Sequence, residues 1–218
     1  MKRNLTFEEI SDGKRYSSGD LAKIGCSDCN GCSECCRVTE DTIFLDPYDI
    51  YSLSAGLSET FATMLDKFVG LTVSDGVVTP FLQKKESDGA CGFLNAEGRC
   101  GIHSFRPGFC RLFPLGRIYN DDGSFDYFIQ VHECPYPNKT KVKIKSWLGI
   151  PSLGRYEEFV RTWHEIVKNI SECMVDNPTL AREANVRMLK IFFETPYDMT
   201  EDFYSQFHER VLEYQGAR

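Results

Sequence analysis

The sequence predicts an α+β fold, in which a small irregular core organised by cysteines and short β-hairpins precedes a C-terminal helical segment. Three observations predict it. Nine of the ten cysteines lie at or before Cys134, turn-forming pairs that end in Gly divide the middle of the chain, and apolar residues recur at helical spacing after Gly154. We therefore expect three parts, namely a polar, loosely attached N-terminal arm (1–25), a cysteine-cluster metal-binding domain (26–153) and a helical segment packed on it (154–218).

The first regular elements are expected after the N-terminal cysteines. Residues 38–45 are predicted to form a short strand. Asp46 followed by Pro47 is typical of a helix start, because Asp caps the first amides and Pro fits the first helical position. A second helix is predicted from Ser58, as its N-cap, to Val69, and its apolar residues on one face indicate core packing.

The middle of the chain is predicted to consist of short β-rich runs separated by turns. The turn signals are Asp75-Gly76, Asp88-Gly89, Glu97-Gly98 and Asp122-Gly123. The Glu97-Gly98 turn is expected to return the chain, so that Cys91 and Cys100 lie near each other across a hairpin. A further strand is predicted over residues 127–131, shortly before Cys134.

The last part of the chain is predicted to be helical. Five large apolar residues recur with a period near 3.6, namely Tyr156, Phe159, Trp163, Ile166 and Ile170. A second helix is expected to start at Asn177-Pro178 and a third at residues 200–203. Cys173 lies near the end of the first of these helices, and we expect it to be a buried small hydrophobe and not a metal ligand.

The main chemical signal is the run of Cys26, Cys29, Cys32, Cys35 and Cys36, with spacings of three, three, three and one. Two residues between cysteines allow both sulfurs to face one soft metal ion. Ser, Asp, Asn and Gly between these cysteines favour tight turns. The run therefore predicts a cysteine-ligated metal or iron–sulfur centre.

Composition limits the setting in which such a centre works. The N-terminus lacks the apolar stretch of a signal peptide, and no apolar run is long enough to span a bilayer. We therefore expect a cytoplasmic protein without a membrane partner, in which clustered cysteines bind metal rather than form disulfides. A net charge of −7 argues against a nucleic-acid partner. The lysines that alternate over residues 139–145 are expected on a solvated edge strand or helix face.

Two blocks of the sequence resemble a known family. The first is Cys29-x2-Cys32-x2-Cys35-Cys36, and the second runs from Cys91-Gly-Phe-Leu through Arg106-Pro-x2-Cys110-Arg-x-Phe-Pro114. Together they resemble the YkgJ-like cysteine-cluster family, a CxxCxxCC zinc- or iron-chelating domain, over about residues 26–135. The resemblance implies a metal or iron–sulfur centre built by eight cysteines: Cys29, Cys32, Cys35, Cys36, Cys91, Cys100, Cys110 and Cys134.

The number and identity of the metal centres remain open at this point. Neighbouring side chains such as Cys35 and Cys36 diverge, so one tetrahedral ion rarely takes both, and two centres or one larger cluster fit better. The consecutive C-x2-C spacings are similar to a bacterial ferredoxin run and favour an iron–sulfur cluster, of the 4Fe-4S type, over zinc. Cys26, His103 or His132 could replace one of the eight cysteines as a ligand.

Three arginines near the cysteines could affect a metal centre, and three functions are compatible with the sequence. Arg37, Arg106 and Arg111 lie beside cysteines and are expected to offset the negative charge of a thiolate cluster, or else to pair with nearby carboxylates. The favoured function is electron transfer, or service as an accessory to a redox or protein-modifying enzyme, with an unidentified protein partner. The alternatives are a zinc-stapled interaction module and an enzyme resembling the flagellin lysine N-methylases. No nucleotide-binding or hydrolase motif assigns a catalytic residue.

Overall fold

The fold combines helices with short antiparallel strand pairs, which confirms the predicted α+β class. The computed structural model describes residues 6–26, 32–38 and 43–216. Its helices are α1 (Phe7–Ile10), α2 (Cys35–Val38), α3 (Pro47–Leu57), α4 (Phe61–Lys67), the 3-10 turn η2 (His103–Phe105), α5 (Gly108–Leu112), α6 (Ile144–Leu148), α7 (Leu153–Asp176), α8 (Pro178–Leu189), the π-helical turn η3 (Lys190–Glu194) and α9 (Phe203–Gly216). Its strands are β1 (Leu21–Gly25), β2 (Val69–Ser74), β3 (Val77–Leu82), β4 (Leu115–Tyr119), β5 (Phe125–Ile129) and β6 (Thr140–Lys143).

The described strands form three separate two-stranded antiparallel sheets, β1–β6, β2–β3 and β4–β5. Asp75 and Gly76 connect β2 to β3, and both have the positive φ that a tight hairpin turn requires. The Asp122-Gly123 turn likewise connects β4 to β5. Two of the four predicted turns therefore make regular hairpins. Of the strand predicted over residues 38–45, residues 39–42 lie outside the described residues, Val38 instead ends α2, and Phe44 forms a single bridge with Phe81.

The N-terminal arm differs from the expectation of loose attachment. β1 pairs with β6, and Ala22 and Ile24 on that strand are completely buried. Tyr16 exchanges backbone hydrogen bonds with Tyr127 at 2.8 Å in both directions, which adds a second attachment. The polar composition of residues 6–20 concealed this, because pairing through the backbone needs no apolar side chains. β6 is an edge strand with exposed lysines, as the alternating pattern predicts.

Helix α3 begins where the sequence predicts, whereas α4 begins at a different residue from the one predicted. The Asp46 side chain accepts a hydrogen bond from the Asp49 amide, and Pro47 occupies the first turn. Ser58 is not an N-cap but ends α3 in a left-handed conformation, with φ of 56°. The cap of α4 is Thr60, whose hydroxyl accepts from the Thr63 amide at 3.2 Å. The prediction that Ser58 caps the second helix is therefore wrong, because Ser58 ends α3 and α4 begins after Thr60.

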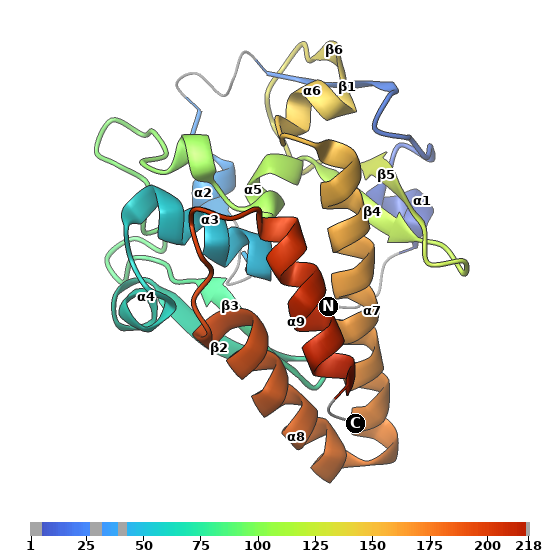
Figure 1. The fold of residues 1–218 in the computed structure, drawn as a ribbon. Coiled ribbons are helices and arrows are strands. Elements are labelled where there is room, and N and C mark those ends of the chain that lie inside the picture. Colours follow the sequence, from blue (N-terminus) through green and yellow to red (C-terminus); the bar gives the residue numbers. More distant parts are fainter. Residues whose placement is uncertain (1–5, 27–31, 39–42, 217–218) are drawn as a thin grey trace.

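The C-terminal segment consists of α7, α8 and α9, which lie beside one another in the lower part of Figure 1. Tyr156, Phe159, Ile166 and Ile170 on α7 are buried, as their spacing predicts. The side chain of Asn185 joins α8 to the β2–β3 hairpin, since its Oδ1 accepts from the Val78 amide at 2.8 Å and its Nδ2 donates to the Gly76 carbonyl at 3.0 Å. The helical segment therefore packs directly against the first part of the chain.

No helix in the described parts of the chain combines the length and the apolar character that a membrane crossing would need.

Candidate metal centre

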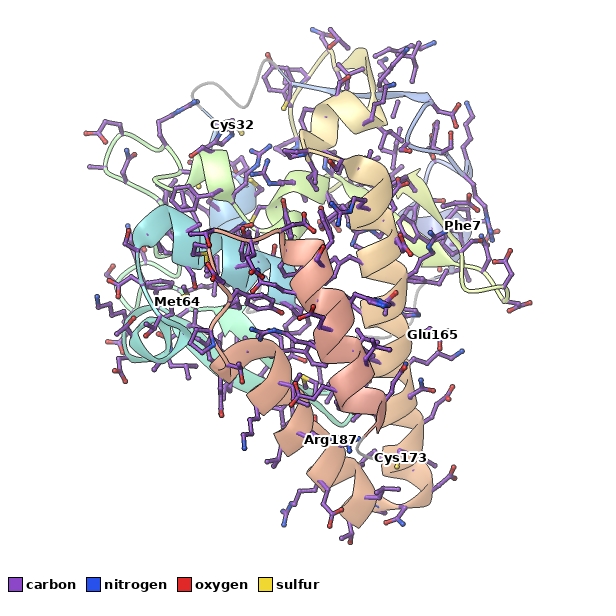
Figure 2. All side chains as sticks on the ribbon, viewed as in Figure 1. Phe7, Cys32, Met64, Glu165, Cys173 and Arg187 are labelled. Atoms are coloured by element: carbon purple, nitrogen blue, oxygen red, sulfur yellow. The ribbon has the colours of Figure 1, made fainter. Side chains whose placement is uncertain are left out.

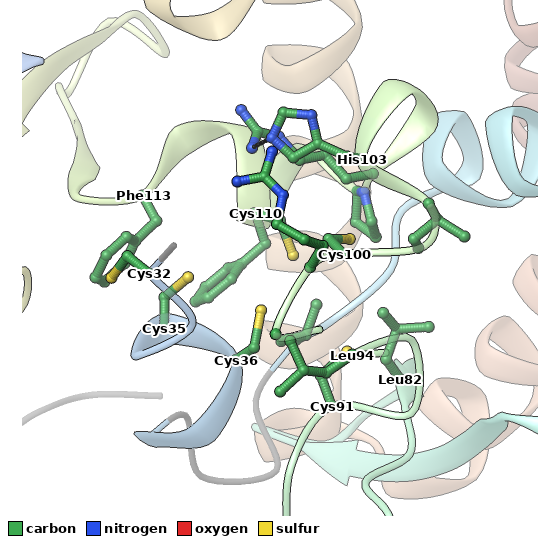
Figure 3. A pocket seen from close by; sticks show the side chains of 17 residues that line it. Cys32, Cys35, Cys36, Leu82, Cys91, Leu94, Cys100, His103, Cys110 and Phe113 are labelled. Carbon is green, nitrogen blue, oxygen red and sulfur yellow. Dashed lines mark hydrogen bonds between the residues drawn. The ribbon is translucent and has the colours of Figure 1, made fainter. Parts of the chain in front are cut away.

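Three chain segments, far apart in the sequence, bring cysteines to one small cavity of about 70 Å³. α2 supplies Cys35 and Cys36, the loop after β3 supplies Cys91 and Cys100, and α5 supplies Cys110. Figure 3 shows these cysteines around the cavity, with the sulfurs of Cys36, Cys100 and Cys110 turned towards its middle. We call these five residues the central thiol group. The rest of the cavity wall is largely apolar and includes Ile43, Leu82, Leu94, Ile102, Phe109 and Phe113.

Backbone hydrogen bonds position the two cysteines of α2 against the loop. The Cys36 amide donates to the Ser33 carbonyl at 3.0 Å, which closes the turn that leads into α2. The Cys91 amide donates to the Cys36 carbonyl at 2.8 Å and fixes the loop directly against this helix. The contact between the two segments therefore does not depend on the thiols themselves.

The loop that carries Cys91 and Cys100 turns back on itself as predicted, but with little regular β structure. Single bridges connect Cys91 to Lys84 and Cys100 to Leu94. The Asn95 amide donates to the Arg99 carbonyl at 2.9 Å across the turn. This return places both cysteines on the cavity wall, as the hairpin prediction requires.

A buried carboxylate holds the start of α5, the helix that carries Cys110. Oδ1 of Asp49 accepts from the Gly108 amide at 2.7 Å, and Oδ2 accepts from the Asp46 amide at 3.1 Å. Asp49 is only 3% exposed. Gly108 is needed here because a Cβ at this position would overlap the hydroxyl of Tyr156. α3 and α7 thus set the position of α5 together.

Sequence reasoning missed Asp49 and Tyr156 as supports of the site. Asp49 occupies the third position of a predicted helix, where an acidic residue is expected for the helix alone. Tyr156 belongs to the apolar stripe of α7. The sequence contains no signal that a carboxylate at position 49 contacts an amide at position 108, because such a contact depends on tertiary packing.

The electrostatic surroundings of the central thiol group suit a cation. Burial is the main reason why the pKa values of Cys91, Cys100 and Cys110 are raised, and neighbouring thiolates raise each of them further. The pKa of Cys35 is raised chiefly by its hydrogen bond with Cys36. Reactive cysteines have the opposite property, a lowered pKa. A metal ion would supply the positive charge that favours the thiolate forms.

Arg106 is the one predicted arginine that lines the cavity among the described residues. Its positive charge acts to lower the pKa values of Cys35 and Cys100. Both pKa values are nevertheless raised, because the hydrogen bond with Cys36 dominates for Cys35 and burial dominates for Cys100. Nη1 of Arg106 lies 2.6 Å from Nε2 of His103, so this His103 nitrogen is the acceptor. Nε of Arg106 is buried and has no hydrogen-bond partner among the described residues, which leaves one donor for an acceptor in the cavity.

The other two arginines do not line the cavity. Arg37 donates from Nε to Ser33 Oγ at 3.2 Å and lies 3.8 Å from Asp88, an exposed ion pair of the ordinary kind. Arg111 donates to the backbone carbonyls of Arg106 and Ser104 at 3.0 and 2.6 Å. It therefore fixes the turn before α5 and does not face the thiols.

The remaining predicted ligands are distributed unevenly. Cys32 lies at the edge of the cavity beside Phe113 (Figure 3), whereas Cys134 is not part of its wall. Cys29 lies outside the described residues. His132 is exposed. Cys173 lies near the far end of α7 (Figure 2), and it is half-buried instead of fully buried, with Sγ 3.8 Å from the Asn177 carbonyl.

The donor set fits a metal that prefers sulfur, although the thiols stand apart. In the described residues, no three His, Cys, Asp or Glu side chains are close enough to hold an ion without moving. All nine cysteines of the described residues are free thiols, and seven of them are predicted ligands, namely Cys32, Cys35, Cys36, Cys91, Cys100, Cys110 and Cys134. Zinc and iron–sulfur clusters both accept such ligands.

Comparison with known proteins agrees with this arrangement of cysteines. A profile of the family described as "CxxCxxCC: Putative zinc- or iron-chelating domain" matches residues 28–140 of the 218-residue chain. Neither the search of curated proteins nor the search of solved structures found a match. The matched region contains α2, the loop after β3 and α5, which are the three segments that supply the central thiol group. The chain therefore belongs to the CxxCxxCC family, whose domain is described as zinc- or iron-chelating.

Proposed function

We propose that the central thiol group binds an iron–sulfur cluster of the 4Fe-4S type and that the protein transfers electrons. The observation that carries this proposal is the presence of six cysteines around one cavity, namely the central thiol group and, at its edge, Cys32. Cys36, Cys91, Cys100 and Cys110 come from three segments and are the ligands we favour. Cys35 adjoins them and could replace one. A bound cluster would supply one-electron chemistry.

The surroundings of the thiols support a cluster over a single ion. A 4Fe-4S cluster and a mononuclear zinc site both take four thiolates, so the preference for a cluster rests on the consecutive C-x2-C spacings and on the charge beside the thiols. A cluster with four thiolates carries net negative charge, and the Arg106 side chain faces that charge from the cavity wall. Nε of Arg106, which has no partner among the described residues, can donate a hydrogen bond to a sulfur.

A protein partner is expected for such a function. Phe109, beside Cys110 on the cavity wall, is 41% exposed, so the cavity lies close to the surface. Electrons could therefore pass to a redox partner, or to a protein-modifying enzyme, without a long path through the protein. The cytoplasm, where thiols stay reduced, is the compartment we expect for this activity.

A structural zinc site is the second candidate, and one observation favours it. Between β3 and α5 the chain is held by single bridges, one 3-10 turn and separate turn hydrogen bonds, without an α-helix or a sheet of its own. A zinc ion held by the same cysteines would fix this loop to α2 and α5. The protein would then be an interaction module without redox chemistry.

Anaerobic purification followed by metal analysis separates the two candidates. The proposal expects iron with acid-labile sulfide, visible absorption, and bleaching when a reductant is added. Zinc alone in a colourless anaerobic protein would refute the cluster and support the structural site. The Cys173→Ala variant is the matched control, since its cysteine lies far from the cavity and its metal content should equal that of the wild type.

A further inference from the structure

The two-stranded sheet β1–β6 has one buried side and one exposed, positively charged side. The register pairs Lys23 with Lys141 and Leu21 with Lys143, and directly opposed residues lie on the same side of a sheet. All four of these residues are exposed, and Leu21 is 54% exposed. Ala22, between the two β1 residues, is completely buried on the other side. We call Leu21, Lys23, Lys141 and Lys143 the lysine face.

The positive charge of the lysine face is not neutralised within the protein. No salt bridge in the described part of the chain involves any of its three lysines. The acidic residue next to β1, Asp20, instead accepts hydrogen bonds from the amide and the hydroxyl of Ser17 at 2.7 and 2.8 Å. The sequence contains no Asp or Glu over residues 134–156, although the chain as a whole has a net charge of −7. The face is therefore a local basic surface on an acidic protein.

The arrangement of the lysines goes beyond what protection of a sheet edge requires. Charged residues on edge strands prevent pairing with other chains. A Glu opposite a Lys would protect both edges equally well and would also attract its neighbour. Here Lys23 lies directly opposite Lys141, and like charges in that position destabilise a sheet. A like-charged pair that opposes folding is explained if the face binds a negatively charged partner.

The lysine face lies beside the part of the molecule that holds the thiol cavity. β6 runs directly into α6, and Figure 1 shows β1, β6 and α6 together at one end of the molecule, above α5. Trp147 on α6 donates from Nε1 to the Phe113 carbonyl at 3.1 Å, and Phe113 lines the cavity. A partner bound to the lysine face would therefore be held near the central thiol group.

We propose that the lysine face is a docking site for the acidic surface of a partner protein. Protein interfaces combine complementary charge with apolar contact, and exposed Leu21 supplies an apolar contact among the lysines. The face has no arginine and no aromatic ring, the groups that most often contact or stack on nucleic-acid bases. The inference rests on the proposed function for its purpose, because electron transfer requires a protein partner.

Binding of a fluorescently labelled oligo-glutamate peptide to the full-length protein, measured by anisotropy at low ionic strength, tests this docking site. Wild type should bind the peptide, and added salt should weaken the binding. The Lys141→Glu/Lys143→Glu variant should bind it about tenfold more weakly or worse. Lys168→Glu/Lys190→Glu is the matched control, since both lysines are exposed, lie on α7 and η3, and change the net charge equally. The control should bind like wild type.

The Lys23→Glu variant separates binding from folding. It replaces a like-charged pair with an oppositely charged pair, so the thermal midpoint should rise while peptide binding weakens. A higher midpoint with wild-type peptide binding would mean that the lysines are only a solvated surface, and would overturn the docking site. Far-UV circular dichroism would confirm that each variant is folded.

Two further results would overturn the docking site. Equal weakening in the Lys141→Glu/Lys143→Glu variant and in its control would show a response to net charge alone. Tighter binding of a labelled single-stranded oligonucleotide than of the peptide, lost in the Lys141→Glu/Lys143→Glu variant, would assign the face to nucleic acid. Neither result depends on the metal. Conversely, a protein that binds the peptide at this face but contains zinc alone would keep the docking site and refute the iron–sulfur cluster.

Discussion

At the scale of single residues, Arg106 has the clearest functional position. It lines the thiol cavity, whereas Arg37 pairs with Asp88 at the surface and Arg111 binds backbone carbonyls. All three lie beside cysteines in the sequence, and the motif favours Arg106 and Arg111, but sequence distance does not determine where a guanidinium points. The side-chain contacts in the structure single out Arg106 as the arginine nearest the thiols.

Replacing Arg106 with Gln should lower the reduction potential of a bound cluster while leaving the iron content intact. The guanidinium stabilises the reduced, more negative form, and one charge acts on another about 8 Å away with about 2 kcal/mol at an effective dielectric constant near 20. Solvent screening reduces this effect, so we expect a fall of several tens of millivolts, measured by redox titration followed by visible absorption.

The Arg161→Gln variant is the control for that measurement, because Arg161 is an exposed residue of α7 and is not part of the cavity wall. Its potential should match that of the wild type. An Arg106→Gln protein with full iron content and an unchanged potential would contradict the tuning role and leave Arg106 as a structural partner of His103.

At the scale of secondary-structure elements, α5 depends on α3. The Asp49 carboxylate accepts hydrogen bonds from two amides, one at the start of α5 and one at the start of its own helix. Only 3% of the surface of Asp49 is exposed, so water cannot readily replace either hydrogen-bond partner. The position of Cys110 therefore depends on a side chain 61 residues earlier in the sequence.

Replacing Asp49 with Ala should destabilise the protein and weaken metal binding. The Gly108 and Asp46 amides would lose a buried acceptor, and each buried unpaired group costs about 1–3 kcal/mol. Asp49→Asn keeps one acceptor oxygen and should give an intermediate loss. Thermal unfolding and metal content measure the two effects, and Asp66→Ala on the exposed face of α4 is the control. Wild-type unfolding and metal content in Asp49→Ala would show that α5 does not need this anchor.

The elements that the sequence predicted well are those with strong local signals. Asp46-Pro47, the Asp75-Gly76 turn and the apolar stripe of α7 each specify their own geometry. The predictions that were wrong concern residues whose structure depends on tertiary packing. Ser58 is chemically a good N-cap but ends α3, and the polar arm is held by pairing of β1 with β6. Cys173 is half-buried because it sits near the end of α7, where the helix leaves the core.

At the scale of the whole molecule, the structure has two sources of stability. Aromatic packing joins α7 to α9 through Phe159, Phe203 and Phe207, and extends to α3 through Tyr48. The cysteine loops after β3 have few regular hydrogen bonds and would gain most from a bound metal. We therefore expect the chain to form its helical core without metal and to depend on metal mainly in the cysteine region.

Removing the metal should lower the thermal midpoint by several degrees while preserving most of the helical signal. A ligand that binds only the native state stabilises it, and its removal reverses that gain. Circular dichroism of the protein before and after anaerobic treatment with a chelator would measure both quantities. Complete loss of the helical signal at low temperature would contradict the view that α7–α9 fold around their own aromatic core.

The cysteine spacings predicted the metal chemistry of the site, but not how the thiols divide. The family resemblance implied eight ligands, whereas the cavity wall holds Cys32, Cys35, Cys36, Cys91, Cys100 and Cys110 but not Cys134. This division depends on the pairing of β1 with β6 and on the contact of α2 with the loop, and both are long-range contacts. Local sequence patterns do not encode such contacts.

The central claim is that the cavity of the central thiol group is the metal centre of this domain. The most direct test compares the metal content of Cys110→Ser with that of Cys173→Ala, both purified without oxygen. We predict that Cys110→Ser loses the metal of the central group, because its thiolate is one of the four favoured ligands, whereas Cys173→Ala retains the wild-type content. Equal metal content in the two variants and the wild type would contradict the claim.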